Sequence, residues 1–259
     1  MERSRRDVLG AGGALLSTAG LAGCIEERVT RRETRATDSM TWALSPDDEG
    51  VALDGEGFED YVGRMADRYG DSGVRGTDFE APDGFGIAYV GRYAITRTTP
   101  GSPTEGEFDL VPEAVEPEAP MLIADACLAR YDLGADRYRY WLWVAADPTD
   151  DRLVREVNLT TLSTGLGLDT GTVVDADTPT VDGSNGTVGL ESPPSGSFPV
   201  RGGTLDTTTV REAGGSYTVE WDGTLNAPQS AVGVCEVERT GAYDLSWTMS
   251  LGYGFEETV

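Results

Sequence analysis

The feature that most constrains the fold is a strict alternation of apolar and polar residues near the C-terminus. Six large apolar residues occupy every second position there: Tyr243, Leu245, Trp247, Met249, Leu251 and Tyr253. Successive side chains of a β-strand point to opposite faces, so this segment predicts a strand with one buried and one solvated face. Such alternation is typical of antiparallel sheets that are wet on one side.

Other segments share this period, and together they predict a mainly β fold, either an antiparallel sandwich or an open barrel. Further strands are expected at 85–95, 138–145, 153–162, 217–222 and 230–238. Residues 121–131 fit a strand or a helix. Two stretches rich in turn-forming residues, 101–120 and 169–204, predict loops, the second with short strands at most.

One helix is expected, at residues 57–70. Apolar residues recur there at spacings of three and four, which places them on one helical face: Phe58, Tyr61, Val62, Met65 and Tyr69. Gly70 is a typical helix stop. We expect this helix to pack on the sheet through its apolar face.

The composition is extremely acidic, with 45 acidic residues against 20 basic ones and a formal net charge of −25. All basic residues are arginines, and the chain has no histidine. Self-repulsion at such a charge destabilises a compact state, but molar salt screens it beyond about 3 Å. The composition therefore indicates a halophilic protein, and it argues against nucleic acid as a partner because phosphate binding needs a basic surface.

The first 24 residues have the layout of an export signal. Arginines precede a short, Gly- and Ala-rich apolar run, which is shorter than the roughly 20 residues of a membrane-spanning helix. Ser4-Arg5-Arg6-Asp7-Val8-Leu9 resembles the twin-arginine export motif, although Val8 stands where many such signals carry Phe. Leu21-Ala22-Gly23-Cys24 resembles a lipobox. Together these motifs resemble the twin-arginine-exported lipoproteins of halophilic archaea, and the resemblance says nothing of the folded part.

The resemblance implies the organisation of the chain. Residues 1–23 would form the signal peptide, with Arg5 and Arg6 as the export signal, and Cys24 would carry the lipid. We interpret residues 24–41 as the lipidated cysteine and a polar tether, and residues 42–259 as a single mainly β extracellular domain. The protein would sit on the outer face of the cell membrane, held by the lipid on Cys24, and would fold before export.

Two other cysteines remain, Cys127 and Cys235, both inside apolar segments. Outside the cell they could form a disulfide. Folding in a reducing cytoplasm would instead leave two separate buried thiols. The sequence does not decide between these alternatives.

Catalytic candidates are few because the chain has neither histidine nor lysine. Triads and Cys-His pairs built on histidine, and Schiff bases built on lysine, are excluded. Leu166-Gly167-Leu168-Asp169-Thr170-Gly171 resembles the aspartic-protease signature, in which two carboxylates activate water. With one copy, Asp169 would need a homodimer to meet a second carboxylate, and an ordinary turn explains the same residues.

Two kinds of surface site are also suggested. Asp175, Asp177 and Asp182 lie in an oxygen-rich segment of the kind that binds calcium, although the spacing is not that of an EF-hand. Asn158 and Asn185 each begin an Asn-X-Thr glycosylation sequence.

Three functions follow from these observations. The first is a lipid-anchored, cell-surface binding or structural module without catalysis or cofactor, whose partner would be an unknown surface protein or ligand. The second is a homodimeric, aspartic-protease-like surface hydrolase that uses Asp169. The third is an accessory solute-binding lipoprotein, although such receptors usually have two α/β lobes and a longer chain.

Overall fold

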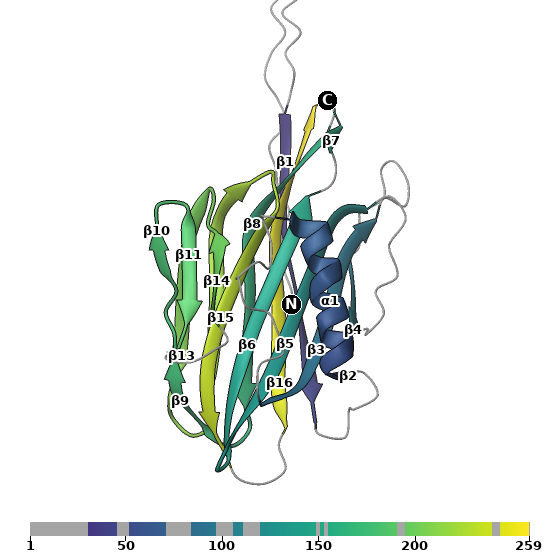
Figure 1. The fold of residues 1–259 in the computed structure, drawn as a ribbon. Helices are drawn as coiled ribbons and strands as arrows, with labels where there is room; N and C mark the ends of the chain where they lie inside the picture. The colour runs from purple at the N-terminus through teal and green to yellow at the C-terminus, as the bar shows by residue number, and fades with distance from the viewer. Residues whose placement is uncertain are drawn as a thin grey trace, which may run out of the picture.

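The structure is a computed structural model, and it describes residues 31–45, 52–70, 84–96, 106–110, 120–148, 151–152, 155–190, 195–239 and 244–258. Within these ranges the fold is mostly β, with antiparallel sheets and a single helix. Two large sheets pack face to face, and a small third sheet lies beside them (Figure 1). The prediction of a mainly β fold with one packed helix is confirmed.

Sheet A contains the strand with the clearest alternation. Its six strands are β1 (Arg31–Leu44), β7 (Asp151–Arg152), β8 (Arg155–Leu168), β13 (Gly203–Val210), β14 (Ser216–Leu225) and β16 (Leu245–Thr258). Their spatial order is β1-β16-β8-β14-β13, and β7 pairs with β8. β16 therefore lies between two neighbours, and Trp247, Met249 and Leu251 point from it into the core, each 0% exposed.

Sheet B lies opposite. Its seven strands are β2 (Ala52–Leu53), β3 (Phe85–Thr96), β4 (Gly106–Leu110), β5 (Pro120–Gly134), β6 (Arg137–Pro148), β9 (Thr172–Ala176) and β15 (Gln229–Glu238). Their order is β2-β3-β5-β6-β15-β9, with β4 also paired to β3. β5 thus resolves the ambiguity at residues 121–131 in favour of a strand. The expectation of a loop at 101–120 is wrong at residues 106–110, because these five residues form β4 and join sheet B.

Sheet C is small and contains β10 (Thr180–Asp182), β11 (Asn185–Gly189) and β12 (Ser195–Pro199). Its strands contact β15 of sheet B. The segment from 169 to 204 therefore has the short strands that its turn-rich composition allows.

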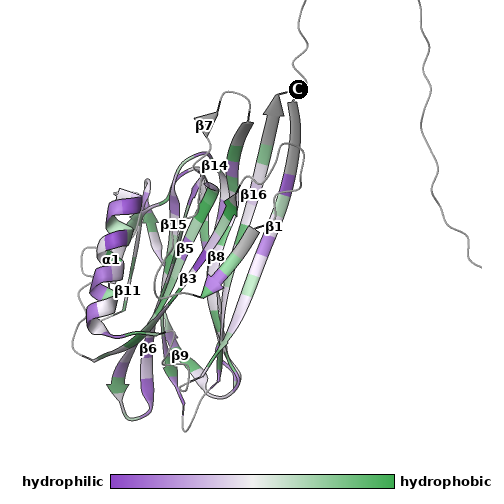
Figure 2. Ribbon diagram, turned by 90° about the vertical axis from the view of Figure 1, so that its right-hand side faces the viewer, coloured by the Kyte–Doolittle hydropathy of each residue, from purple (hydrophilic) through white to green (hydrophobic). Residues whose placement is uncertain are grey.

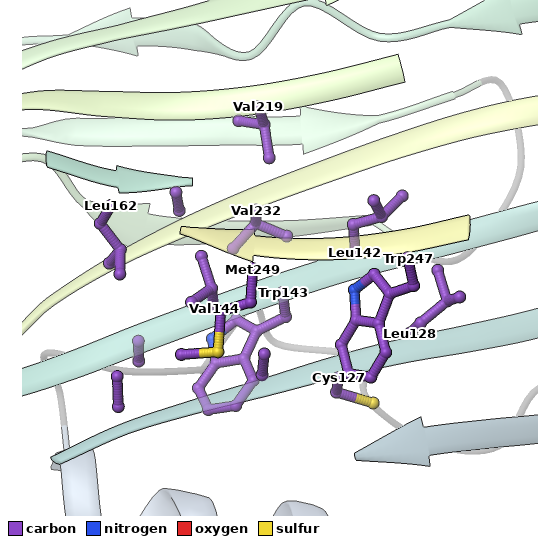
Figure 3. Packing of buried hydrophobic residues seen from close by; sticks show 14 of the residues in the cluster. Cys127, Leu128, Leu142, Trp143, Val144, Leu162, Val219, Val232, Trp247 and Met249 are labelled. Atoms are coloured by element: carbon purple, nitrogen blue, oxygen red, sulfur yellow. The ribbon is translucent and has the colours of Figure 1, made fainter. Parts of the chain in front are cut away.

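The main core lies between sheets A and B (Figure 3). Leu142 and Val144 of β6 face Trp247 and Met249 of β16 there, and all four are fully buried. The alternate residues of β6 point to the other side of sheet B, where Trp143 meets the helix. Both faces of β6 are thus buried, as its two-sided apolar pattern predicts.

The helix α1 (Gly55–Tyr69) covers the outer face of sheet B (Figure 2). Asp54 caps its first turn by accepting a hydrogen bond from the Gly57 amide at 2.9 Å. The buried residues are Phe58, Tyr61, Met65 and Tyr69, as the spacing predicts. Gly70 ends the helix at a φ of 53°, a value that glycine adopts without steric cost.

The tether is shorter than expected. β1 begins at Arg31 and pairs with β16 through fourteen consecutive residues, from Arg31–Thr258 to Leu44–Leu245. Residues 31–41 therefore belong to the folded domain. The sequence misled here because an edge strand is held by main-chain hydrogen bonds, which polar residues form as well as apolar ones do.

The sandwich has two distinct ends. At one end, which we call the anchor end, β1 starts, β16 finishes and β7 lies close by (Figure 1). At the opposite, far end, the β5–β6 hairpin turns. The Arg239 amide donates to the Asp136 carbonyl at 2.9 Å there, and the Asp169 amide donates to the Asp244 carbonyl at 3.4 Å.

Candidate functional site

The best-defined charged cluster lies beneath α1 and is centred on Asp125, which is 2% exposed. Its carboxylate is 2.8 Å from Arg68 Nη1, 2.7 Å from Arg92 Nε and 2.7 Å from the Tyr69 hydroxyl. Burial, followed by the nearby Asp125 charge, raises the pKa of Tyr69. Because these groups satisfy one another and fix the helix to sheet B, we assign this cluster a structural role.

A second charged cluster lies between β6 and β15 on the outer face of sheet B. The buried Glu236 carboxylate pairs with Arg139 and with the partly exposed Arg137. Arg139 Nε also donates to Glu236 Oε1 at 3.1 Å. This cluster joins two neighbouring strands, and its Glu236 and Arg139 are buried like Asp125 of the first cluster.

A third polar cluster was missed in the sequence because one member lies in the expected tether. Asp38 of β1 accepts hydrogen bonds from Tyr93 of β3 and, at 2.8 Å, from Tyr253 of β16. Burial raises the pKa of Tyr253 to about 12. The only sequence signal that Asp38 faces the core is its place in the two-residue period of β1, two positions before Met40. The contacts tie an edge strand of sheet A to sheet B.

Cys127 and Cys235 are both free and buried. Cys127 is paired in register with Trp143 of β6, and Cys235 is paired with Tyr140 of the same strand. Trp143 and Tyr140 are three residues apart and therefore point to opposite faces of sheet B, and the two thiols do the same. The disulfide left open by the sequence is therefore not formed. Burial raises the pKa of both thiols, and since thiolate is the reactive form, neither is suited to act as a nucleophile.

Asp169 is exposed in the turn after β8, at the far end of the sandwich. The aspartic-protease resemblance also includes a distal apolar-glycine segment, for which Val188-Gly189-Leu190 is the candidate, and this segment lies on and just after β11 in sheet C. The two parts of the aspartic-protease resemblance thus belong to different sheets.

The calcium candidates do not converge. Asp177 Oδ2 accepts the Gly189 amide at 2.6 Å, Asp175 Oδ1 accepts the Ala176 amide at 2.9 Å, and Asp182 is exposed at the end of β10. Over the residues that the structure describes, no group of three or more acidic or cysteine side chains is placed to hold a metal ion.

The glycosylation candidates differ in accessibility. Asn185 is exposed and directly follows the turn between β10 and β11, as expected for an acceptor. Asn158 is half-buried on β8, where it pairs in register with Gly254 of β16. Arg5, Arg6 and Cys24 lie outside the described residues.

The outer face of sheet A is the most unusual surface. We call it the hydroxyl face. Its members point away from the core because they alternate with buried residues: Thr37, Ser39 and Thr41 of β1; Ser246, Thr248 and Ser250 of β16; Thr161, Ser163, Gly165 and Gly167 of β8; Ser216 and Thr218 of β14; Thr204 and Thr208 of β13. No described helix or strand packs over it, whereas α1 covers the corresponding face of sheet B.

The hydroxyl face is closely packed at its glycines and is ordered by its own hydrogen bonds. The hydroxyls of Thr41 and Thr248 are 2.9 Å apart, and Ser250 donates to Ser39 at 2.7 Å. A Cβ atom added at Gly165 would lie 2.5 Å from Thr218 Oγ1. The face thus offers closely spaced donors and acceptors, and its β13–β14 side also carries carboxylates, where Asp206 pairs in register with Glu220 and Asp222 with Thr204.

Comparisons with protein-family models, with curated proteins and with solved structures found no match. Among the described residues, α1 is neither long nor apolar enough to cross a membrane. The functional argument therefore rests on the chemistry of this chain alone.

Proposed function

We propose that the protein is a lipid-anchored, cell-surface binding module without a catalytic centre. The observation that carries the proposal is the contrast between its buried charges and its open face. The carboxylates and arginines of the two buried clusters are engaged in holding elements together. The hydroxyl face, in contrast, is uncovered and ordered.

The chemistry of the hydroxyl face favours a neutral ligand rich in hydrogen-bonding groups. Hydroxyls both donate and accept hydrogen bonds, and they remain effective in molar salt, which screens fixed charges. Surface glycans have this chemistry. The lipid on Cys24 would keep the face close to such a ligand.

The test uses the lipidated protein, expressed in a halophilic archaeal host with a twin-arginine pathway. Wild-type protein is expected in the membrane fraction and Cys24→Ser in the medium. Retention of Cys24→Ser on the cells would overturn the anchor.

Binding is then measured to neutral polysaccharides in molar salt. Ser250→Arg places a bulky guanidinium on the hydroxyl face and should weaken binding at least tenfold. Gly63→Arg adds the same charge on the exposed side of α1, where a new Cβ atom meets nothing within 4 Å, and should bind like wild type. If both variants bind equally well and have the same free energy of unfolding as wild type, the hydroxyl face is not the binding surface.

A further inference from the structure

The length of chain between the lipid and the sandwich limits how the domain can sit on a membrane. Only residues 25–30 separate Cys24 from the first residue of β1. Even fully extended, this segment spans about 25 Å. The inference below rests on the proposed lipid anchor.

The sandwich is longer than this tether. β1 and β16 each contain fourteen residues, which corresponds to about 45 Å at the usual rise of a strand. The anchor end, where β1 starts, is therefore held near the lipid, and the far end is beyond the reach of the tether when the strands point away from the membrane.

The distribution of charge favours that upright arrangement. Residues 25–35 carry four arginines and three glutamates, a net charge of +1, while residues 36–259 carry 13 arginines and 40 acidic residues, a net charge of −27. Basic residues next to a membrane are attracted to anionic headgroups. The acidic body is repelled by the same headgroups, and in molar salt this repulsion acts only where protein and lipid come within about 3 Å of each other.

We infer that the sandwich stands on an anionic lipid surface by its anchor end, with its strands directed away from the membrane. The starts of β1 and β8, the end of β16 and β7 form the lipid-facing surface. The β5–β6 hairpin is then the outermost part of the described chain, and the hydroxyl face is presented sideways rather than pressed against lipid.

The outermost hairpin has two features that suit an exposed contact point. Leu133 is 42% exposed. Ala135 and Asp136 adopt positive φ values of 52° and 63°, a conformation that is strained for residues other than glycine. The upright arrangement places this strained tip where a partner approaching the cell arrives first.

The test measures height above the membrane by energy transfer. Thr37→Cys, Val210→Cys and Leu133→Cys are each labelled with a donor dye and reconstituted, as full-length lipidated protein, in phosphatidylglycerol vesicles that contain a headgroup-labelled acceptor. Thr37 and Val210 both lie on the outer side of sheet A: Thr37 is midway along β1, Val210 is at the far end, and Leu133 lies in the hairpin. Cys127 and Cys235 stay unlabelled because they are buried.

An upright sandwich should give a transfer efficiency at Thr37 at least twice that at Val210 and Leu133. Equal efficiency at Thr37 and Val210 means that the strands lie parallel to the membrane, and it overturns the upright orientation while the anchor stands. Failure of the lipidated protein to float with the vesicles overturns the anchor, and the orientation falls with it.

Discussion

At the scale of single residues, a glycine in one large sheet makes room for a core side chain of the other. Gly233 of β15 faces Tyr217 of β14, whose hydroxyl donates to the Asp177 carbonyl at 2.9 Å. A Cβ atom at Gly233 would lie 2.6 Å from Tyr217 Cε1. The tyrosine has no room to withdraw, because it is fully buried and held at its far end by this hydrogen bond.

We therefore expect Gly233→Ala to lower the free energy of unfolding by about 1–3 kcal/mol, the usual cost of overpacking a core. Gly63→Ala, at an exposed position inside α1 with open space around it, should raise it by about 0.5–1 kcal/mol. Urea unfolding in molar salt measures both variants. A neutral Gly233→Ala would show that the sheets are further apart than described.

The sequence predicted best those side chains that need only an apolar environment and no particular partner. Trp247 and Met249 need only an apolar core, and their alternation identifies them. Asp125 needs particular partners, Arg68 and Arg92, which lie 57 and 33 residues away in the chain. The spacing of apolar residues, whether strand-like or helical, does not indicate which arginines will pair with a buried aspartate.

At the scale of elements, α1 shows how an apolar stripe and a buried charge cooperate. The stripe brings the helix to sheet B, where Trp143 meets Tyr61 and Tyr69 edge to face at 6.3 and 5.8 Å between ring centroids. Arg68 and Tyr69 then bind Asp125. The apolar contacts are tolerant of small shifts, whereas the hydrogen bonds fix the helix in one position.

Asp125→Asn should consequently destabilise the protein by about 3–5 kcal/mol, because it leaves Arg92, buried at 5% exposure, next to a neutral amide. The matched change Asp67→Asn, on the exposed side of the same helix, should stay within about 0.5 kcal/mol of wild type. Thermal unfolding in molar salt compares them. Similar melting temperatures for the two variants would contradict the structural role of the cluster.

The least predictable elements were those at the edges. β1 was interpreted as a tether because residues 31–39 are polar, yet Met40, Trp42 and Leu44 continue its two-residue period. β4 lies within a Pro- and Glu-rich stretch, and its five residues pair only with β3. The hydroxyl face could not be anticipated either, since it depends on which five strands become neighbours.

At the scale of the whole molecule, the net charge of −25 sets the conditions in which the sandwich is stable. Charges held close together on one compact body repel one another unless salt screens them. The clusters around Asp125 and Glu236 use arginines for specific pairs, and they neutralise little of the remaining acidic surface.

We expect the circular dichroism of the β-sheets to be lost or weakened when the salt concentration falls from molar to millimolar. Replacing the sodium chloride with sucrose at equal osmolality should also unfold the protein, because sucrose does not screen charge. An unchanged spectrum at millimolar salt would contradict a halophilic fold.

The pairing of the first described strand with the last has a consequence for the synthesis of the protein. β16 lies between β1 and β8 and is completed only at residue 258. Until residues 245–258 have been synthesised, β1 has no strand beside it and sheet A is divided into two parts. A chain that terminates before β16 lacks the strand that joins these parts, and we expect it to misfold. Export in the folded state, which the twin-arginine resemblance implies, would then keep such truncated chains inside the cell.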